Sequence, residues 1–383
     1  MAKVLLVDTN FSSGPIYGAL IDMGHEVHVV GNNPDDYLAK VSPNYWNLNY
    51  ADTDALAELV RENDFEYLVP GCTDRSYASC VAVSGGRFPG IDNVDAYEAI
   101  FNKSTFRTLA DKLNLPVPQK LAPDLHPLRW PVIVKPVDAF SGKGITVLHE
   151  IDAPALEEAV DKARNASLTG EYLIEEFVEG QLHSHTAFLK DGRVIQDFMV
   201  QEDSTVNPFV VDTSRVLSNV SSKLRERLRN CVEHIARELS LNDGLLHTQF
   251  MSNDDDLWLI EITRRCPGDL YSQLIELTTG YPYVRSYILP FLGEQAPDLD
   301  CTLRGEPIMR HTVTLHAAQS LAYLHFKLAI QIERWTPLSL VGDQLKPSPF
   351  SRVGILFCRA TDQQDLDLIY QKTLQRNLYE IRG

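Results

Sequence analysis

The first hundred residues alternate short apolar runs with stretches of helical spacing. These predict strands and helices in turn, over residues 3–8, 16–23, 26–30, 53–63 and 67–69. Such an alternation is typical of a parallel sheet with helices on its faces. We therefore expect an α/β lobe over residues 1–100.

Residues 101–295 show a different pattern, in which strands follow one another with short turns between them. Strands are expected at residues 131–135, 145–149, 172–178, 184–189, 194–200, 245–251 and 257–263, and helices at residues 95–113, 153–166 and 221–239. The first of these helices is interrupted around Asn102, and the Pro-rich run that ends at Pro131 is a connector. This order favours an α+β domain.

The last part of the chain, residues 296–383, follows a boundary expected at residues 293–300. It contains strand-like stretches at residues 308–315 and 353–359, and a helix that begins at Gln363. We expect an appended α/β lobe, and its residues carry no recognisable chemistry.

Composition and charge restrict the class of protein. A chain of 383 residues with 44% hydrophobic and 23% charged residues is long enough for two or three globular domains. The net charge of −17 argues against a nucleic-acid partner, which needs a basic surface. No signal segment or membrane-spanning apolar run is evident, and the six cysteines are scattered without a CxxC pair. We expect a cytoplasmic protein with reduced thiols and no membrane partner.

The stretch of residues 131–144 carries the first candidate chemistry. Three β-branched residues form a strand that delivers Lys135 to a loop containing Ser141, Gly142, Lys143 and Gly144. Glycines let backbone N–H groups approach phosphate oxygens, and lysines neutralise their charge. The sequence is not a P-loop motif, and taken alone it is equally consistent with a solvated hairpin loop.

Two turns of the N-terminal lobe are candidates for substrate contact. Ser12, Ser13 and Gly14 occupy the first strand-to-helix turn, where free helix N–H groups favour anions. The segment Thr73, Asp74 and Arg75 follows the strand at residues 67–69, and ligands of parallel sheets bind beyond the carboxyl ends of strands. For Thr73 or Asp74 an equally weighted alternative is the N-cap of a helix. The dinucleotide fingerprint GxGxxG is absent, so NAD is not assigned.

Four features in one order resemble the ATP-grasp superfamily. They are Lys103 before a helix, Lys135 before the Gly-Lys-Gly loop, the run Glu-Glu-Phe-Val-Glu-Gly at residues 175–180, and Glu-Ile-Thr-Arg-Arg at residues 261–265. The resemblance covers about the first three quarters of the chain. It implies a Rossmann-like N-terminal lobe and an ATP-grasp domain of two α+β subdomains, the smaller being a lid at about residues 118–178.

The resemblance assigns nucleotide contacts residue by residue. Lys103 and Lys135 match the lysines that contact ATP phosphates, with Lys135 also catalytic. The loop Ser141, Gly142, Lys143 and Gly144 resembles the lid over the β- and γ-phosphates. Glu175, Glu176 and Val178 match the hinge that reads adenine, although one glutamate of the pair is expected to be only an inward or outward strand position.

The resemblance also implies a metal and a reaction centre. Glu261 matches a ligand of Mg²⁺, with Mn²⁺ as an alternative, and one or two carboxylates plus phosphates can suffice for such an ion. Arg265 matches an arginine that steadies the anionic intermediate. Arg264 could hold the carboxylate of the acceptor. Asp269 could face the substrate, and capping the helix that begins near Leu270 is a slightly favoured alternative.

The chain departs from the family pattern at four positions. Gln249 stands where an acidic metal ligand is usual, Thr263 stands in place of an asparagine, and Arg264 in place of the proline that follows it. Leu182 replaces a ribose-contacting glutamate, which leaves His183 as a substitute. These changes could weaken a second metal site.

The resemblance implies an ATP-dependent carboxylate-amine ligase that forms an amide through an acyl phosphate and releases ADP and phosphate. Its substrates would be a small carboxylic acid and an amine. Residues 45–50 and 88–91 further resemble free-standing members related to carbamoyl-phosphate synthase and amino-acid ligases, and a homodimer is expected on the same ground. Two alternatives stay open: an enzyme that activates bicarbonate or formate, and a nucleotide-binding regulatory protein with reduced catalysis.

Overall fold

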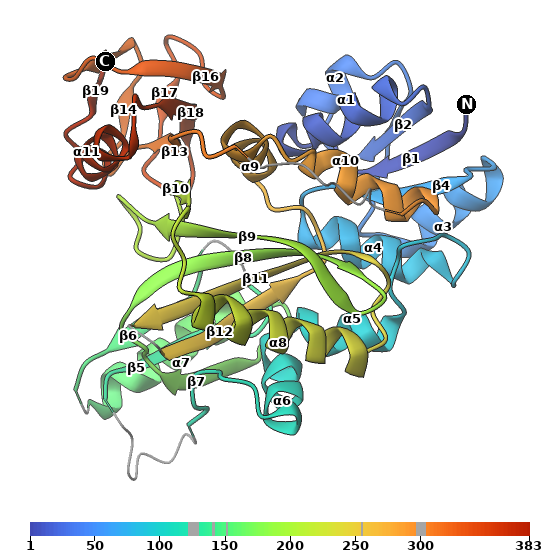
Figure 1. Cartoon of the computed structure of the whole chain (residues 1–383), viewed down its shortest axis with the longest axis horizontal. Helices are drawn as coiled ribbons and strands as arrows, with labels where there is room; N and C mark the ends of the chain where they lie inside the picture. The colour runs from blue at the N-terminus through green and yellow to red at the C-terminus, as the bar shows by residue number, and fades with distance from the viewer. Residues whose placement is uncertain (122–129, 140–141, 151, 254–255, 296–303) are drawn as a thin grey trace.

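The computed structural model describes residues 1–121, 130–139, 142–150, 152–253, 256–295 and 304–383, which form three connected parts (Figure 1). The N-terminal lobe contains a parallel sheet of order β3-β2-β1-β4. Its strands are β1 (Lys3–Val7), β2 (Glu26–Gly31), β3 (Tyr45–Asn47) and β4 (Tyr67–Pro70). The apolar runs of β1 and β4 are buried because helices cover both faces of the sheet, and this confirms the expected α/β class.

Helices alternate with these strands along the chain. They are η1 (Phe11–Ser13), α1 (Gly14–Asp22), α2 (Tyr37–Val41), α3 (Thr53–Glu62) and α4 (Asp74–Ser84). The α4 helix begins at the carboxyl end of β4, where Thr73 accepts a hydrogen bond from the Ser76 backbone N–H. Thr73 is therefore the N-cap, as one of its two sequence-based interpretations has it.

A single antiparallel sheet of eight strands runs through the centre of the molecule, in the order β12-β11-β8-β9-β10-β13-β18-β16. Its first five strands are β8 (Gln181–Lys190), β9 (Arg193–Asp203), β10 (Thr213–Val216), β11 (Gly244–Asn253) and β12 (Asp256–Thr263). The hairpin of β8 and β9 turns at Asp191, which has a positive φ, and Gly192, as the sequence predicts. The strand β10 was not anticipated.

One face of this sheet packs against helices. These are α5 (Val94–Phe101), α6 (Lys103–Leu113) and α8 (Ser222–Glu238), whose apolar side chains share a core with those of β11 and β12. Asn102 separates α5 from α6 and accepts a hydrogen bond from the Ser104 backbone N–H, so it caps α6 at the expected interruption.

A smaller sheet of order β6-β5-β7 stands at one end of the central sheet, with one helix against it. It consists of β5 (Val132–Pro136), β6 (Thr146–Leu148) and β7 (Tyr172–Glu176), with α7 (Ala153–Ala166). All its pairings are antiparallel. We call this unit the lid subdomain.

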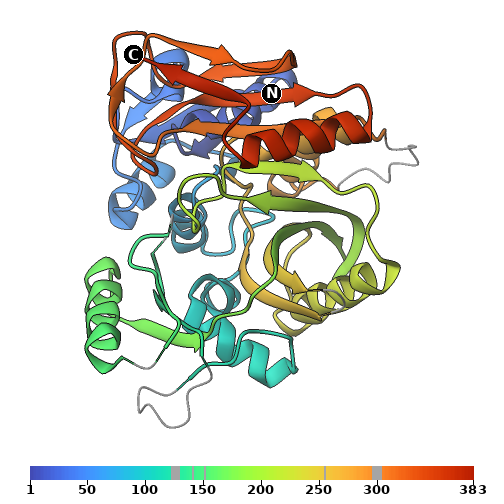
Figure 2. The ribbon, with the colours of Figure 1, turned by 90° about the vertical axis from the view of Figure 1, so that its left-hand side faces the viewer.

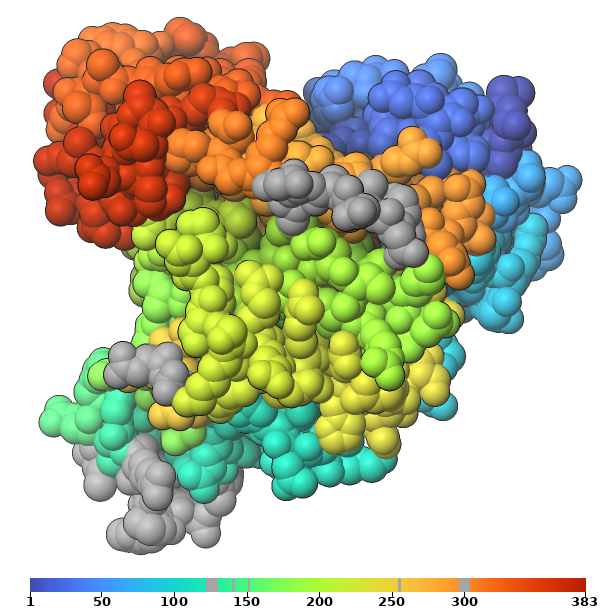
Figure 3. All heavy atoms as spheres, in the orientation of Figure 1, coloured from blue at the N-terminus to red at the C-terminus, as the bar shows by residue number. Residues whose placement is uncertain are grey.

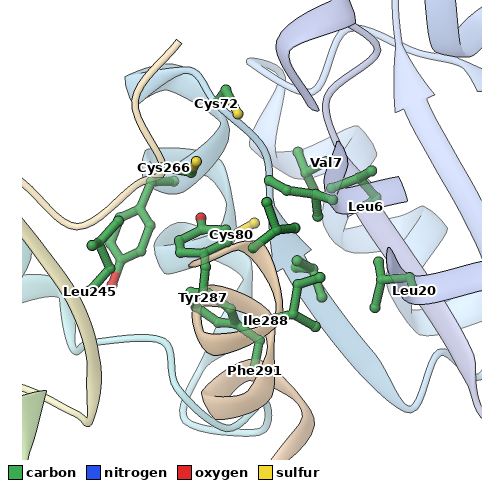
Figure 4. Packing of buried hydrophobic residues seen from close by; sticks show 14 of the residues in the cluster. Leu6, Val7, Leu20, Cys72, Cys80, Leu245, Cys266, Tyr287, Ile288 and Phe291 are labelled. Carbon is green, nitrogen blue, oxygen red and sulfur yellow. The ribbon is translucent and has the colours of Figure 1, made fainter. Parts of the chain in front are cut away.

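The chain returns to the N-terminal lobe after β12. Helices α9 (Tyr271–Thr279) and α10 (Tyr283–Ile288), with η2 (Leu289–Leu292), join the core of that lobe. Figure 4 shows Tyr287 and Ile288 among side chains of the lobe, and the Tyr287 hydroxyl donates to the Pro70 carbonyl at 3.0 Å. The N-terminal lobe is thus continuous in packing with the central sheet.

The C-terminal part extends the central sheet. Its strands β13 (Ile308–Thr314), β16 (Gln331–Pro337) and β18 (Arg352–Arg359) are members of it. Two short pairs complete the part, β14 (Gln319–Ser320) with β17 (Gln344–Leu345) and β15 (Tyr323–Phe326) with β19 (Tyr379–Arg382), together with α11 (Gln363–Leu374). Figure 2 shows them at the top, above the central sheet.

Two further properties follow from the described residues. None of their helices has both the length and the apolar character needed to cross a bilayer. The cysteines among them, at positions 72, 80, 231, 266 and 358, are free thiols.

Candidate active site

A buried cluster of two cations and one carboxylate lies where the lid subdomain meets α6. Lys135, near the end of β5, places its Nζ 2.5 Å from Oε2 of Glu175 on β7. Arg107 on α6 donates from Nε to Oε1 of the same carboxylate at 2.6 Å, and from Nη1 to the Ile260 carbonyl at 3.1 Å. The cluster therefore ties the lid to α6 and to β12.

Burial and neighbouring charges set the protonation of this cluster. Burial lowers the pKa of Lys135 to about 8, with Glu175 opposing the change and Arg107 adding to it. Burial also works against ionisation of Glu175, but the charges of Lys135 and Arg107 outweigh it and hold the pKa of Glu175 below its ordinary value. The protonation of Lys135 therefore depends on the charged groups around it.

Lys103 lies at the first turn of α6 and faces the end of β12. Its Nζ is 3.4 Å from Oε2 of Glu261 and 3.4 Å from the Ala139 carbonyl. The Glu261 side chain is 45% exposed, so its carboxylate is open to a ligand. Lys103, Lys135 and Glu261 therefore converge on one region, as expected from the sequence.

Gln249 and Glu261 lie directly opposite each other on β11 and β12, so their side chains share one face of the sheet. The Gln249 Nε2 donates to Oε2 of Glu202 at 2.9 Å. This bond directs the amide nitrogen toward Glu202 and leaves the amide oxygen available. One exposed carboxylate and one amide oxygen are hard donors that fit Mg²⁺, provided that phosphates supply further oxygens.

Arg265 is held by the N-terminal lobe. Its Nε and Nη2 donate to the two oxygens of Asp74 at 2.9 and 3.0 Å, and the Thr263 hydroxyl donates to the same carboxylate at 3.1 Å. Asp74 was expected to contact a substrate or, as the alternative to Thr73, to cap α4; the cap is Thr73, and the Asp74 carboxylate positions Arg265. Burial opposes the charge of Arg265, yet Asp74 raises its pKa above the ordinary range.

The glycine loop of the lid closes onto the loop that follows β9. Gly142 has a φ of +68°, and a Cβ atom there would lie 2.6 Å from Cβ of Phe209. Both the positive φ and the short distance to Phe209 therefore require glycine at this position. Lys143 is exposed, Gly144 has a positive φ, and Ser141 lies outside the described residues.

Two predicted site residues are in the wrong place for their roles. Arg264 is 3% exposed, and it donates to Asp92 at 2.7 Å and to the Leu245 carbonyl at 2.6 Å, so it cannot hold an acceptor. His183 of β8 pairs with Phe250 of β11, and the next pair along these strands is Ser184 with Gln249. Because successive side chains of a strand point to opposite faces, His183 lies on the face of the sheet away from Gln249. There it stacks on Phe250 with the ring centres 5.1 Å apart. The alternation of strand side chains explains this error.

The hinge assignment also changes. Glu175 is fully buried, and both of its oxygens are held by cations, so its side chain is not available to adenine. Glu176 points outward, and its carboxylate accepts the Gln119 backbone N–H at 3.0 Å. Val178 is half-buried just after β7. One inward and one outward glutamate is the alternative that the strand pattern had left open.

The remaining candidates mostly have structural partners. The Ser13 hydroxyl donates to Asp8 at 2.7 Å, and Ser12 accepts the Asp269 backbone N–H at 3.0 Å. Gly14 is the first residue of α1, and Arg75 is exposed. Asp269 forms an ion pair with Arg352 of β18 and does not cap α9 through its side chain.

Three residues of the site were missed in the sequence. Arg107 is four positions after Lys103 and therefore on the same face of α6, a spacing that could have suggested it. Glu202 on β9 and Arg310 on β13 are 4% and 3% exposed. No motif surrounds either of them, and only the pairing of distant strands brings them to the site.

Known proteins resemble the part of the chain that carries most of these residues. Residues 128–273 match the family model of the ATP-grasp domain. The carbamoyl phosphate synthase large chain of Archaeoglobus fulgidus is 23% identical over 297 residues, which are 73% of this chain and 27% of that protein. The chain thus spans about a quarter of the length of that relative.

Solved structures resemble the whole chain. The L-amino acid ligase of Bacillus licheniformis superimposes with a TM-score of 0.78 at 16% identity, covering 100% of this chain and 99% of that one. The phosphoribosylglycinamide synthetase of Anaerococcus prevotii gives a TM-score of 0.76 at 16% identity, covering 100% and 99%. These likenesses establish a shared fold over the full length.

Proposed function

Because this chain contains an ATP-grasp domain, we propose that it is an ATP-dependent ligase that joins a carboxylic acid to an amine through an acyl phosphate. The products would be an amide, ADP and phosphate. The observation that carries the proposal is the convergence of Lys103, Lys135 and Glu261 at the junction of the lid with α6 and β12, to which the glycine loop is joined through Ala139. Two cations, one open carboxylate and a loop of backbone amides form a site for a polyphosphate with its metal.

Each residue of the site has a proposed role in binding ATP or in catalysis. Lys103 and Lys135 neutralise the phosphates of ATP, and the lid excludes water while the phosphoryl group moves. Glu261 and the Gln249 amide oxygen would hold Mg²⁺, which supplies electrostatic stabilisation of the phosphates when bound. Arg265, fixed by Asp74, faces the position at which negative charge develops.

Two displacement steps complete the reaction. A carboxylate oxygen of the acid attacks the γ-phosphorus, and the bond from that phosphorus to the β–γ bridging oxygen breaks to release ADP. The neutral amine then attacks the acyl carbon, phosphate leaves with the electrons of the C–O bond, and the nitrogen gives up one proton, which the departing phosphate can accept. Positioning and charge neutralisation suffice for both steps, so no nucleophilic side chain is required.

The proposal includes what the family resemblance implies for the protein as a whole. We expect a cytoplasmic homodimer with small-molecule substrates. We expect three units, at residues 1–100, 101–295 and 296–383, with the lid at about residues 118–178. Light scattering on the purified chain tests the dimer.

A matrix of substrates tests the activity. Phosphate release is measured with ATP and Mg²⁺ across amino acids, other carboxylic acids, bicarbonate and formate, each with and without amines. Release that needs both an acid and an amine, lost in Lys135→Ala and kept in the exposed control Lys120→Ala, supports the ligase. Release with bicarbonate or formate alone identifies the alternative enzyme class, and ATP binding without turnover identifies a regulatory protein.

A further inference from the structure

The loop between β9 and β10, residues 204–212, lies against the glycine loop of the lid. A Cβ atom on Gly142 would lie 2.6 Å from Cβ of Phe209 and 3.2 Å from the Phe209 carbonyl oxygen. The backbone of the lid therefore rests directly on Phe209. The position of the β9–β10 loop decides where this part of the lid can close.

Hydrogen bonds within the β9–β10 loop tie Phe209 to the two ends of the loop. The Asp212 carboxylate accepts the backbone N–H and the hydroxyl of Thr205 at 2.9 and 2.7 Å. The Asp212 backbone N–H donates to the Asp203 carbonyl at 3.0 Å and closes the base of the loop. The Asn207 side-chain oxygen accepts the Phe209 backbone N–H at 3.0 Å. Phe209 is thus held relative to Asp203 and Asp212.

A tyrosine of α11 holds the first end of the loop. The Tyr370 hydroxyl donates to Oδ2 of Asp203 at 2.7 Å, and the Gln201 amide donates to the same oxygen at 2.9 Å. The Tyr370 ring is buried beneath Arg215, whose guanidinium carbon lies 4.5 Å from the ring centre. Because the ring is packed in place, its hydroxyl offers Asp203 a fixed donor, and a hydrogen bond to a carboxylate is a strong one.

A tyrosine of β19 acts on the second end through His311 of β13. The Thr213 hydroxyl donates its one hydrogen to Oδ1 of Asp212 at 2.8 Å, so it accepts from Nδ1 of His311, 2.8 Å away. The other ring nitrogen, Nε2, then accepts the Tyr379 hydroxyl at 2.6 Å. Burial lowers the pKa of His311 to about 4, which keeps the ring neutral, as this chain of hydrogen bonds requires.

The main chain of β13 adds a direct bond to the second end. The Thr312 backbone N–H donates to the Asp212 carbonyl at 2.6 Å. The three elements β13, α11 and β19 all belong to the C-terminal part, whereas Gly142 and Phe209 lie within residues 128–273 of the ATP-grasp domain. Each end of the β9–β10 loop therefore has partners in a different part of the chain from the lid.

We propose that the C-terminal part positions the lid, with Tyr370 and Tyr379 as positioning residues that fix the β9–β10 loop on which the lid closes. Both tyrosines act through the loop and not on the nucleotide itself. The C-terminal part, whose sequence indicates no chemistry, thereby has a role in closing the ATP site. The inference rests on the binding of ATP beneath the lid, as proposed above, and it needs no particular acid or amine.

Hydrogen–deuterium exchange of the full chain tests the inference without turnover. Exchange is followed at residues 142–150 and 204–212, with and without Mg²⁺ and a non-hydrolysable ATP analogue. The analogue should slow exchange at both segments of the wild type. Tyr370→Phe keeps the ring and removes the hydroxyl, so exchange at residues 204–212 should rise about tenfold, the scale of one hydrogen bond to a charged group. The slowing by the analogue at residues 142–150 should shrink by about threefold or more.

Further variants separate positioning from general stability. Asp203→Asn keeps an oxygen that can accept from Tyr370 and should retain most of the slowing at the lid, whereas Asp203→Ala should behave as Tyr370→Phe does. Tyr379→Phe should loosen the loop from its other end. Tyr323→Phe is the matched control, because it makes the same change at a side chain of β15 that is 59% exposed, and it should leave both segments as in the wild type. Thermal melting verifies that each variant is folded.

Two results overturn the inference. One is wild-type slowing at residues 142–150 in both Tyr370→Phe and Tyr379→Phe, because the tyrosines would then stabilise their loop without acting on the lid. The other is binding of the analogue, measured by calorimetry, without any slowing at residues 142–150 of the wild type.

Failure of the proposed function gives a different result. If the exchange differences are as expected but no acid and amine lead to phosphate release, the ligase is removed and the positioning role is kept. Phosphate release that needs an acid and an amine, together with unchanged lid exchange in the tyrosine variants, keeps the ligase and removes the positioning role.

Discussion

Asp74 and Arg265 form a two-point ion pair between residues 191 positions apart in the chain. Asp74 opens α4 of the N-terminal lobe, and Arg265 follows β12, an edge strand of the central sheet. The lobe therefore fixes the guanidinium that faces the proposed reaction centre. Figure 3 shows, at the left edge of the molecule, a hollow between the lid subdomain and the C-terminal part.

Loss of the Asp74 carboxylate should impair turnover more than nucleotide binding. Asp74→Asn removes the charge that orients Arg265, and a displacement of about 1 Å at a reacting centre can cost about 100-fold in rate. We expect kcat to fall by about that factor while the Kd for ATP stays within about threefold. Steady-state kinetics and calorimetry measure the two quantities.

The neighbouring pair provides the control. Asp92→Asn breaks the pair with Arg264, which lies in the core and faces no ligand. It should lower the midpoint of denaturation, because a buried charge left unpaired costs about 3–5 kcal/mol. If the folded Asp92→Asn enzyme also loses about 100-fold in kcat, or if Asp74→Asn does not, the division of roles between the two arginines is wrong.

Affinity for ATP should depend on pH through Lys135. The protonated amine binds phosphate, and burial lowers its pKa to about 8 in the free protein. Below pH 8 the charge is already present, so affinity should be flat; above pH 8 binding must take up a proton, so affinity should fall by up to about tenfold per pH unit. Calorimetry in buffers of different ionisation enthalpy detects the proton uptake.

Lys135→Met is the comparison for this pH effect. The variant should bind ATP more weakly at pH 7 and should show no further fall between pH 8 and 9.5. A wild-type affinity that is constant over that range, or a slope shared by both proteins, would contradict the assignment of the charge to Lys135.

Glu175 should contribute to stability far more than its neighbour. Glu175→Gln leaves Lys135 and Arg107 buried without their counter-ion, a change that typically costs about 3–5 kcal/mol. Glu176→Gln alters one hydrogen bond to a backbone N–H, worth about 1 kcal/mol. Urea denaturation at pH 7 compares the two variants, and equal losses would show that the cluster is not what joins the lid to α6.

The contact of Gly142 with Phe209 should matter for turnover. Gly142→Ala adds a Cβ atom 2.6 Å from Phe209, whereas Gly170→Ala, at a similar φ of +74°, meets nothing within 4 Å. Both substitutions carry a backbone penalty of about 1–2 kcal/mol. Only Gly142→Ala should lower kcat, by about tenfold or more, because only there must the lid loop shift; a matching loss in Gly170→Ala would attribute the effect to backbone strain.

Patterns within short segments were predicted well from the sequence. The order β1, α1, β2 follows from continuous apolar runs separated by helical spacing, and the break at Asn102 follows from a capping residue between two helical stretches. The order of the motifs along the chain assigned Lys103, Lys135 and Glu261 to one site. These inferences depend on residues near one another in the chain.

Features that depend on contacts between residues far apart in the chain could not be predicted from the sequence. Arg264 and Arg265 are adjacent, and only the fold decides which of them enters the core and which faces Asp74. The strand β13 was expected near its observed bounds, but its place in the central sheet comes from pairing with β10 and β18. That pairing brings Arg310 to the site. Every residue of β13 is buried, so the strand shows no alternation of buried and exposed positions that would have singled out Arg310.

The central claim is the acyl phosphate, and isotope transfer tests it most directly. The acid of the active pair is labelled with ¹⁸O in its carboxylate, and the products are analysed by mass spectrometry after turnover with ATP and Mg²⁺. We predict ADP together with phosphate that carries one ¹⁸O from the acid, because the carboxylate oxygen that attacks the γ-phosphorus leaves with it. Phosphate without label, or label in AMP with release of pyrophosphate, would contradict the account.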